Sequence, residues 1–204
     1  MMATKVWLIS HAANAALRAG VLSAGISGAD EPVESLDARA VEAMDAWRAR
    51  WHAPILASAR GAARVLTSPA EIAQASATAA GFEAVVAPAL AETAYGEWAG
   101  RRLIDIARGT PDALAAWTRD PAFRPPGGGE SFDDVRARVG AWLDALPQID
   151  EAIVAFTHAS VIRAAVLHAL GAPSATFRQL EIAPLSVTAL RRTAQGWVWM
   201  AALT

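Results

Sequence analysis

The chain has 204 residues, of which 54% are hydrophobic and 19% are charged, and its formal net charge is -2. This composition is too apolar for a disordered chain, and the length favours one domain with a full hydrophobic core. There is no basic excess of the kind that non-specific nucleic-acid binding needs. The absence of cysteine excludes disulfides, cysteine-ligated zinc and thiol catalysis.

The first predicted element is a short buried strand at residues 5–9, which ends in polar Ser10 and His11. The apolar part of this segment is too short for a signal sequence, and no uncharged apolar run in the chain reaches the roughly 18 residues of a membrane span. We therefore expect a cytoplasmic protein that does not enter a membrane. A long loop with at most one helical turn should cover residues 10–35.

The following elements alternate between helices and strands. A helix is expected from Leu36 to about Trp51, and the helix after the second strand should begin with Ser68 as N-cap and Pro69 in its first turn. A capping box at Ser131 marks the start of another helix. The remaining strands are predicted at residues 63–67, 83–87, 152–157, 178–192 and 196–203, and the remaining helices at residues 101–118 (broken near 109–111), 131–146 and 158–170.

This alternation predicts a three-layer α/β/α sandwich with a mostly parallel central sheet. We expect a single domain over residues 1–204, with a helical and loop insertion around residues 88–129. Trp197 and Trp199 alternate with Val198 and so share one face of the last strand. They indicate either core packing or the contact of a homodimer.

The residues that could carry chemistry lie where predicted strands meet loops or helices, which is where open α/β sheets place their sites. Each segment is a weak signal alone. Together they place two histidines after two apolar strands, with a loop glutamate between them in the chain. The segments are LISHA at residues 8–12, LTSPA at 66–70, LAETAYGEWAG at 90–100, PPGGGES at 125–131 and FTHASVIR at 156–163.

In this order the segments resemble the histidine phosphatase superfamily, the phosphoglycerate mutase-like proteins, over about residues 5–170. The family pattern opens with Arg-His-Gly after a strand, continues with Ser-Ser-Pro, Leu-x-Glu…Gly-x-Trp-x-Gly and Pro-Pro-Gly-Gly-Glu-Ser, and ends with Ser-His-Gly-Gly-Val-Ile-Arg. The resemblance implies a phosphoglycerate mutase-like fold and a small phosphorylated substrate or anion as the binding partner. It implies no cofactor and no nucleic-acid partner.

The resemblance also implies a role for each of three residues. His11 would attack a phosphoryl group and become phosphohistidine, Glu92 would protonate the leaving oxygen, and His158 would donate to the phosphoryl oxygens. A neutral imidazole is a competent nucleophile near pH 7. These three are the expected catalytic residues.

The departures from the family pattern concern the phosphate clamp. Ser10 stands where the family has an arginine before the histidine, Ala12 replaces the glycine, and Ile72 stands at the second arginine position. Losing two charge-assisted clamps would cost roughly 3–6 kcal/mol of transition-state binding. Expected substrate-binding residues are Ser10, Asn14, Arg18 and Ala159, and further candidates to replace the lost arginines are Arg60, Arg64, Arg101 and Arg102.

Three interpretations remain open from the sequence. The first is a weakly active phosphatase acting on a small phosphomonoester, and the second is a non-catalytic member of the same fold that binds a ligand or partner. The third is a metal site formed by His11, Glu92 and His158, a two-histidine, one-carboxylate set. A mutase is disfavoured, because shifting a phosphoryl group on an acidic sugar needs a strongly positive pocket.

Overall fold

The computed structural model describes residues 4–24, 35–59, 63–147 and 152–200. Its sheet has the strand order β3-β2-β4-β1-β5-β6. The pairs of β1 with β4, β2 with β4 and β2 with β3 are parallel, and β5 runs antiparallel to β1 and β6. The strands are β1 Lys5–Ser10, β2 Ala63–Thr67, β3 Val85–Val86, β4 Ala152–Thr157, β5 Val187–Thr193 and β6 Gly196–Met200.

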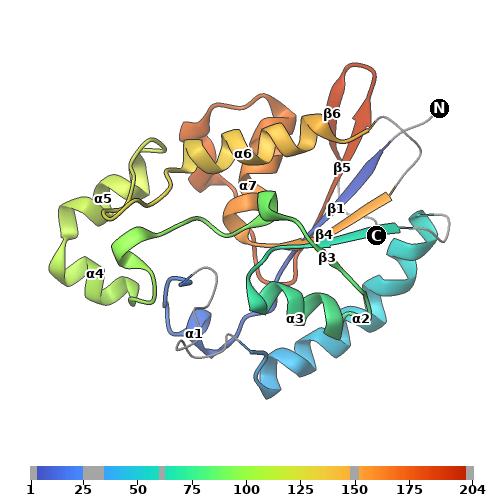
Figure 1. Cartoon of the computed structure of the whole chain (residues 1–204), viewed down its shortest axis with the longest axis horizontal. Coiled ribbons are helices and arrows are strands. Elements are labelled where there is room, and N and C mark those ends of the chain that lie inside the picture. Colours follow the sequence, from blue (N-terminus) through green and yellow to red (C-terminus); the bar gives the residue numbers. More distant parts are fainter. Residues whose placement is uncertain (1–3, 25–34, 60–62, 148–151, 201–204) are drawn as a thin grey trace.

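Helices cover both faces of this sheet. In Figure 1, α6 and α7 lie on one side of it and α2 and α3 on the other, while α4 and α5 lie at the far end of the molecule. The predicted α/β sandwich with a mostly parallel sheet is confirmed. The helices are α1 Ala15–Arg18, α2 Ala38–Ser58, α3 Glu71–Ala79, α4 Leu103–Gly109, α5 Pro111–Arg119, α6 Phe132–Ala145 and α7 Ala159–Leu170, with short 3-10 helices at η1 Pro88–Leu90, η2 Gly96–Trp98 and η3 Ser174–Gln179.

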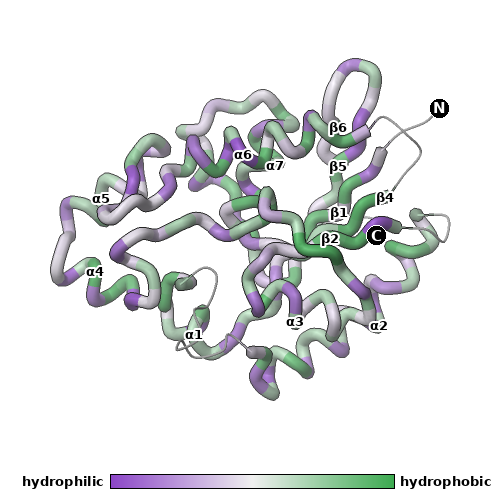
Figure 2. The backbone as a smooth tube through the Cα atoms, viewed as in Figure 1, coloured by the Kyte–Doolittle hydropathy of each residue, from purple (hydrophilic) through white to green (hydrophobic). Residues whose placement is uncertain are grey.

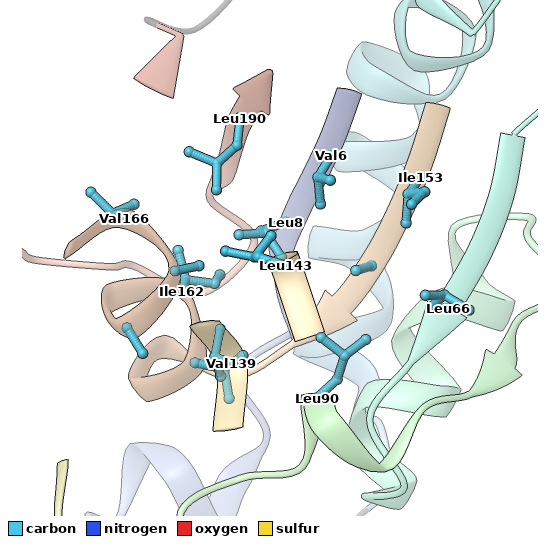
Figure 3. Packing of buried hydrophobic residues seen from close by; sticks show 14 of the residues in the cluster. Val6, Leu8, Leu66, Leu90, Val139, Leu143, Ile153, Ile162, Val166 and Leu190 are labelled. Atoms are coloured by element: carbon cyan, nitrogen blue, oxygen red, sulfur yellow. The ribbon is translucent and has the colours of Figure 1, made fainter. Parts of the chain in front are cut away.

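The two central strands are buried on both faces because alternate side chains enter different cores. Val6 and Leu8 of β1 pack toward α6 and α7 together with Ile153 of β4 (Figure 3). Trp7 and Ile9 point the other way, into the core under α2 and α3. The central strands accordingly form the most continuously apolar part of the chain in Figure 2.

Helix α2 is longer than predicted. The structure extends it to Ser58, through Pro54, because Ile55 continues the buried face begun by Met44 and Trp47. Val41, one turn before Met44 and Asp45, is 43% exposed.

The predicted N-cap at Ser68 is wrong. Helix α3 begins at Glu71 with Ala70 as its N-cap, and no side chain caps it. The hydroxyl oxygen of Ser68 instead accepts a hydrogen bond from the backbone N–H of Ala70 and lies 2.8 Å from Nε2 of His158. The polar side chain that follows the strand therefore belongs to the site and not to the helix.

The predicted strand 178–192 is shorter than expected. It begins at Val187, and the preceding chain forms η3 and then a turn at Leu185, where φ is 60°. Trp197 packs against the core beside α6 and α7, whereas Trp199 is 50% exposed. Whether Trp199 contacts a second copy stays a prediction.

The segment between residues 88 and 129 holds η1, η2, α4 and α5. Leu22, Trp98 and Ile106 form a small buried cluster of their own in this part of the molecule, with Trp117 and Phe123 packed against it. We refer to α4, α5 and the loop to residue 129 as the cap. Among the described helices, none is long and apolar enough to cross a membrane.

Candidate active site

The register of β1 and β4 sets the two site histidines side by side. Ser10 pairs with Thr157 in the parallel ladder, so His11 and His158 both follow the carboxyl ends of neighbouring strands. The backbone N–H of His11 donates to the carbonyl oxygen of Thr157 at 2.9 Å. The two imidazole rings meet edge to face with their centroids 4.9 Å apart. The predicted neighbourhood of His11 and His158 is thus present.

His11 is held as a neutral ring with a defined tautomer. Its Nδ1 lies 2.8 Å from the carbonyl oxygen of Ala12, which can only accept, so the proton sits on Nδ1. Nε2 is left with its lone pair. Burial, helped by the neighbouring charge of His158, lowers the pKa of His11 to about 4. His11 is therefore a neutral potential nucleophile at pH 7.

Glu92 faces both histidines and is held as a carboxylate. Its Oε2 lies 3.1 Å from Nδ1 of His158, and its Oε1 accepts from the backbone N–H of Thr93 and from the hydroxyl of Ser160. Burial raises the pKa of Glu92, but the charge of His158 and these hydrogen bonds outweigh it and lower the pKa to about 2. Glu92 can act as a proton donor only after something nearby raises that pKa.

His158 is fully buried and has one nitrogen without a well-directed hydrogen bond. Nε2 lies 2.8 Å from the hydroxyl of Ser68. Nδ1 is at ion-pair distance from Glu92, yet within the described part of the chain no acceptor lies in line with its N–H. Buried polar groups are nearly always paired. Glu92 is therefore the partner of this nitrogen, through an ion-pair contact that is not well aligned as a hydrogen bond.

The loop that carries Glu92 is fixed from two elements of the core. Thr157, at the end of β4, donates its hydroxyl to the carbonyl oxygen of Leu90 at 2.7 Å. Arg138 of α6 donates from Nη1 to the carbonyl oxygens of Ala89 and Ala91, at 2.8 and 3.1 Å. Nothing in the sequence pattern singled out Arg138, because its partners are backbone atoms 47 and 49 residues away.

The PPGGGES segment also supports this loop. Glu130 forms an ion pair with Arg138 at 3.0 Å, and its carboxylate accepts from the backbone N–H of Ala94. Gly96 packs so closely on the segment that an added Cβ would lie 2.1 Å from the carbonyl oxygen of Pro126. The backbone of Gly96 has φ +55°, so only glycine satisfies both conditions.

A cavity of about 350 Å³ opens over His11 and Glu92. Ser10 and Ala159, two of the predicted substrate-binding residues, line it. A smaller pocket of about 70 Å³ beside it is lined by Asn14, Ile72 and His158, with His11 and Glu92 shared between the two. The side chain of Asn14 accepts from the backbone N–H of Leu17 and caps α1.

The arginines proposed from the sequence lie elsewhere. Arg18 pairs with Asp37 and is not among the described residues that line either pocket, so its predicted role in substrate binding finds no support in the geometry. Arg64 and Arg101 are exposed, and Arg102 pairs with Asp105. Arg60 lies outside the described residues.

Two arginines that sequence reasoning did not consider as replacements line the large cavity. They are Arg163 of α7 and Arg178 of η3. Arg163 belongs to the FTHASVIR segment, where its position four residues after Ala159 placed it one helical turn from the site. Arg178 carries no sequence signal, because η3 is brought to the cavity only by tertiary packing.

The His11–Glu92–His158 cluster also has a composition that metals accept. One ligand atom from each residue lies within 4.8 Å of the others. Two imidazoles and one carboxylate suit several divalent transition metals. However, both oxygens of Glu92 and one nitrogen of His11 already contact protein groups. A metal would have to take Nε2 of His11 and displace the contact between Glu92 and His158.

Comparison with known sequences points to one family. The sequence model of the histidine phosphatase superfamily (branch 1) matches residues 36–202, a range that includes Glu92 and His158 and begins after His11. The Bifunctional protein Rv2228c of Mycobacterium tuberculosis is 33% identical over 140 residues. That alignment covers 65% of this chain and 38% of the relative, so the chain spans well under half of that protein's length.

Solved structures show the same fold over nearly the whole chain. A mycobacterial glucosyl-3-phosphoglycerate phosphatase superposes with a TM-score of 0.76 at 20% identity, covering 97% of both chains. The protein TTHB049 of Thermus thermophilus superposes with a TM-score of 0.67 at 25% identity, covering 97% of this chain and 99% of that one. These likenesses extend the shared architecture to the segment that carries His11.

Proposed function

Because the chain belongs to the histidine phosphatase superfamily, we propose that it hydrolyses a small phosphomonoester through a phosphohistidine formed on His11. The free Nε2 lone pair of the neutral, buried His11, next to the Glu92 carboxylate, is the observation that carries the proposal. A neutral nucleophile with a carboxylate and a second histidine around it matches the needs of phosphoryl transfer. Phosphatase activity in the structural neighbour named above supports the same class of reaction.

The reaction has two steps in this proposal. Nε2 of His11 attacks phosphorus, the bond from phosphorus to the ester oxygen breaks, and the leaving oxygen takes a proton from Glu92. Water then attacks the phosphohistidine, Glu92 accepts its proton, and inorganic phosphate leaves with His11 restored. The incoming phosphoryl dianion raises the pKa of Glu92 from its resting value of about 2, which makes the carboxyl available as the acid.

The second interpretation, a ligand-binding protein without catalysis, predicts the same cavity and no covalent intermediate. The observation that supports this interpretation is that neutral Ser10 and Ile72 stand at the two positions where the family pattern has arginines. The tautomer of His11 favours catalysis, since a protein that only binds has no need of a free Nε2 lone pair. We expect slow turnover because the two clamping charges are missing.

Trapping the intermediate tests the proposal. The protein is mixed with phenyl phosphate, quenched in base and examined by mass spectrometry for a phosphoryl group on His11. We expect the adduct in the wild type, none in His11→Gln, and both slower formation and slower hydrolysis of the adduct in Glu92→Gln, which lacks the acid of the first step and the base of the second. His168→Gln is the matched control, because His168 lies on α7 and pairs with Asp144 away from the cavity.

A metal-dependent reaction would give a different result. Chelator-treated protein retains the adduct and the turnover in our proposal, and added Zn²⁺ inhibits by occupying Nε2 of His11. Turnover that disappears with chelation and returns with one equivalent of metal would contradict the phosphohistidine route. Binding of phosphate without any adduct or turnover would establish the non-catalytic interpretation.

A further inference from the structure

Arg163 and Arg178 place two positive charges in the wall of the cavity. Nε of Arg163 donates to the carbonyl oxygen of Leu180 at 2.7 Å. That contact fixes the guanidinium and leaves its two terminal nitrogens without a hydrogen bond from the described part of the chain. The guanidinium carbon of Arg178 lies 4.4 Å from the ring centre of Trp117 and 4.9 Å from that of Phe177. Both groups are therefore held in place by contacts that leave donors free.

Among the described residues, neither arginine forms an ion pair within 4 Å with an acidic side chain, although the carboxylates of Glu92 and Glu181 act on Arg163 from farther away. Glu92 is engaged by His158, Thr93 and Ser160, and Asp120 on the cavity rim accepts from the backbone N–H of Ala122. Burial lowers the pKa of both guanidinium groups, and the charge of Arg163 lowers the pKa of Arg178 further. The charges of Glu92 and Glu181 offset part of this effect on the pKa of Arg163. Two partly desolvated like charges are stabilised when an anion binds between them.

The rest of the wall is strongly aromatic. Arg178 joins the cap to the core through its contact with Trp117 of α5, and Phe132 stacks on Phe177 with ring centres 4.8 Å apart. Phe123 of the cap also lines the cavity. At about 350 Å³ the cavity has the size of sites that hold small organic ligands.

The positive charges and the nucleophile of the cavity come from different elements of the fold. At the two positions where the family pattern has arginines, this chain has the neutral residues Ser10, in the large cavity, and Ile72, in the small pocket. The cavity cations come from α7 and η3. The cavity thus offers two cations to a second oxyanion on a ligand whose phosphoryl group is bound at His11.

We propose that Arg163 and Arg178 form an oxyanion subsite, and that the substrate is a phosphomonoester with an aromatic or apolar body and a second anionic group. This inference rests on the proposed function for the end of the ligand that reacts. The phosphoryl group lies at His11, the body lies against Trp117 and Phe177, and the second anion accepts hydrogen bonds from both arginines.

Matched substrates test this arrangement. We compare kcat/KM for phenyl phosphate and 4-carboxyphenyl phosphate in the wild type, Arg163→Gln, Arg178→Gln and the double variant. The wild type should prefer the carboxylated substrate by about tenfold to a hundredfold, mostly through KM, as expected for two charge-assisted hydrogen bonds. Each single variant should lose part of the preference and the double variant all of it.

Lysine variants and a neighbouring arginine serve as controls. Arg163→Lys and Arg178→Lys keep the charge and should recover part of the preference. Arg119→Gln should leave it unchanged, because Arg119 is exposed on α5 and does not line the cavity. Equal losses of kcat for both substrates in the double variant would overturn the proposal. That result would mean that the arginines bind the phosphoryl group itself.

A binding measurement separates this inference from the question of catalysis. Benzylphosphonate and 4-carboxybenzylphosphonate cannot be hydrolysed, and their affinities can be measured by titration calorimetry whether or not the protein turns over. We expect the carboxylated ligand to bind more tightly than the plain one to the wild type, and both to bind equally to the double variant. A third ligand, 4-(phosphonomethyl)benzylphosphonate, shows whether the subsite prefers a carboxylate or a second phosphoryl-like group. Equal affinity of the wild type for all three ligands would refute the subsite even if hydrolysis is confirmed.

Discussion

The Nδ1–H of His11 donates to the carbonyl oxygen of Ala12, its own neighbour in the chain. This bond fixes Nε2 as the nitrogen with the lone pair, and burial keeps the ring neutral. Neither property follows from the residue type, because tautomer and charge depend on which backbone atoms and which second histidine lie nearby. The loop geometry after β1 therefore determines the reactivity of the residue.

The lowered pKa of His11 predicts a pH dependence of stability. In the unfolded chain a histidine has a pKa near 6.5, and in the folded protein His11 has a pKa of about 4. Between these values the unfolded state binds a proton that the folded state does not. The free energy of unfolding should therefore fall as the pH drops from about 6.5 to 4, by about 3 kcal/mol in total, and stop falling from this source below pH 4.

Urea unfolding at several pH values between 7 and 4.5 measures this contribution. His11→Gln should show a shallower decline than the wild type, since His52 and His168 are present in both proteins. Glu92 titrates in a lower window, because its pKa of about 2 lies below the unfolded value of about 4.5. Parallel declines in the two proteins between pH 6.5 and 5 would show that His11 is protonated as readily when folded as when unfolded.

At the scale of elements, the Glu92 loop depends on α6 and β4 for its position. Arg138 reaches from α6 to two backbone carbonyls of the loop, and Thr157 at the end of β4 holds a third. Three contacts from two core elements leave the loop little freedom. Arg138 is thus a positioning residue, acting on the reaction only through Glu92.

Arg138→Met should slow turnover about tenfold to a hundredfold, the range that follows from losing hydrogen bonds of a charged donor worth about 1.5–3 kcal/mol. In a Glu92→Gln background the same substitution should reduce turnover much less, because Glu92, the residue that Arg138 positions, is already inactive. Steady-state kinetics on the four proteins of this cycle provide the measurement.

Arg192→Met is the matched control for that cycle. Arg192 also donates to two backbone carbonyls, those of Asp144 and Leu146, but at the opposite end of α6 from the Glu92 loop. The Arg192→Met variant should have a lower free energy of unfolding, while the turnover of the folded protein stays unchanged. Full additivity of Arg138→Met and Glu92→Gln would mean that Arg138 acts on the rate by another route.

The alternation of elements and the positions of His11, Glu92 and His158 could be predicted because they depend on local patterns. Strand β1 is apolar and ends at a polar pair, and Ser131 shows its capping box in the sequence and in the structure. The prediction for Ser68 was wrong because a serine that precedes a helix can either cap the helix or belong to the active site, and the sequence does not distinguish the two. The structure alone identifies its contact with His158.

The distribution of charge over the whole molecule could not be predicted. Arg163 is separated from Arg178 by the end of α7 and most of η3, and the two meet at one cavity only after the sheet, the cap and η3 have packed together. Every arginine considered from the sequence was near a site residue in the chain. The two arginines that line the cavity instead come from segments that follow His158 in the chain, and tertiary packing brings them there.

Restoring the family arginines tests how far the pocket as a whole has been rebuilt. Ser10 opens on the cavity of about 350 Å³, so Ser10→Arg has room to place a guanidinium beside the phosphoryl group. We expect it to raise kcat/KM for phenyl phosphate about tenfold to a hundredfold through one charge-assisted contact. Ser10→Met, which adds length without charge, should give no gain.

Ile72→Arg should behave differently, because Ile72 is 2% exposed and the pocket beside it has only about 70 Å³. Forcing a guanidinium into that space should lower the free energy of unfolding by about 1–3 kcal/mol and add little to the rate. The double variant should then be no faster than Ser10→Arg and less stable, as measured by kinetics and urea unfolding. A stable double variant whose rate exceeds the product of the two single gains would instead mean that the family's clamp fits this pocket unchanged, and that only the two charges have been lost.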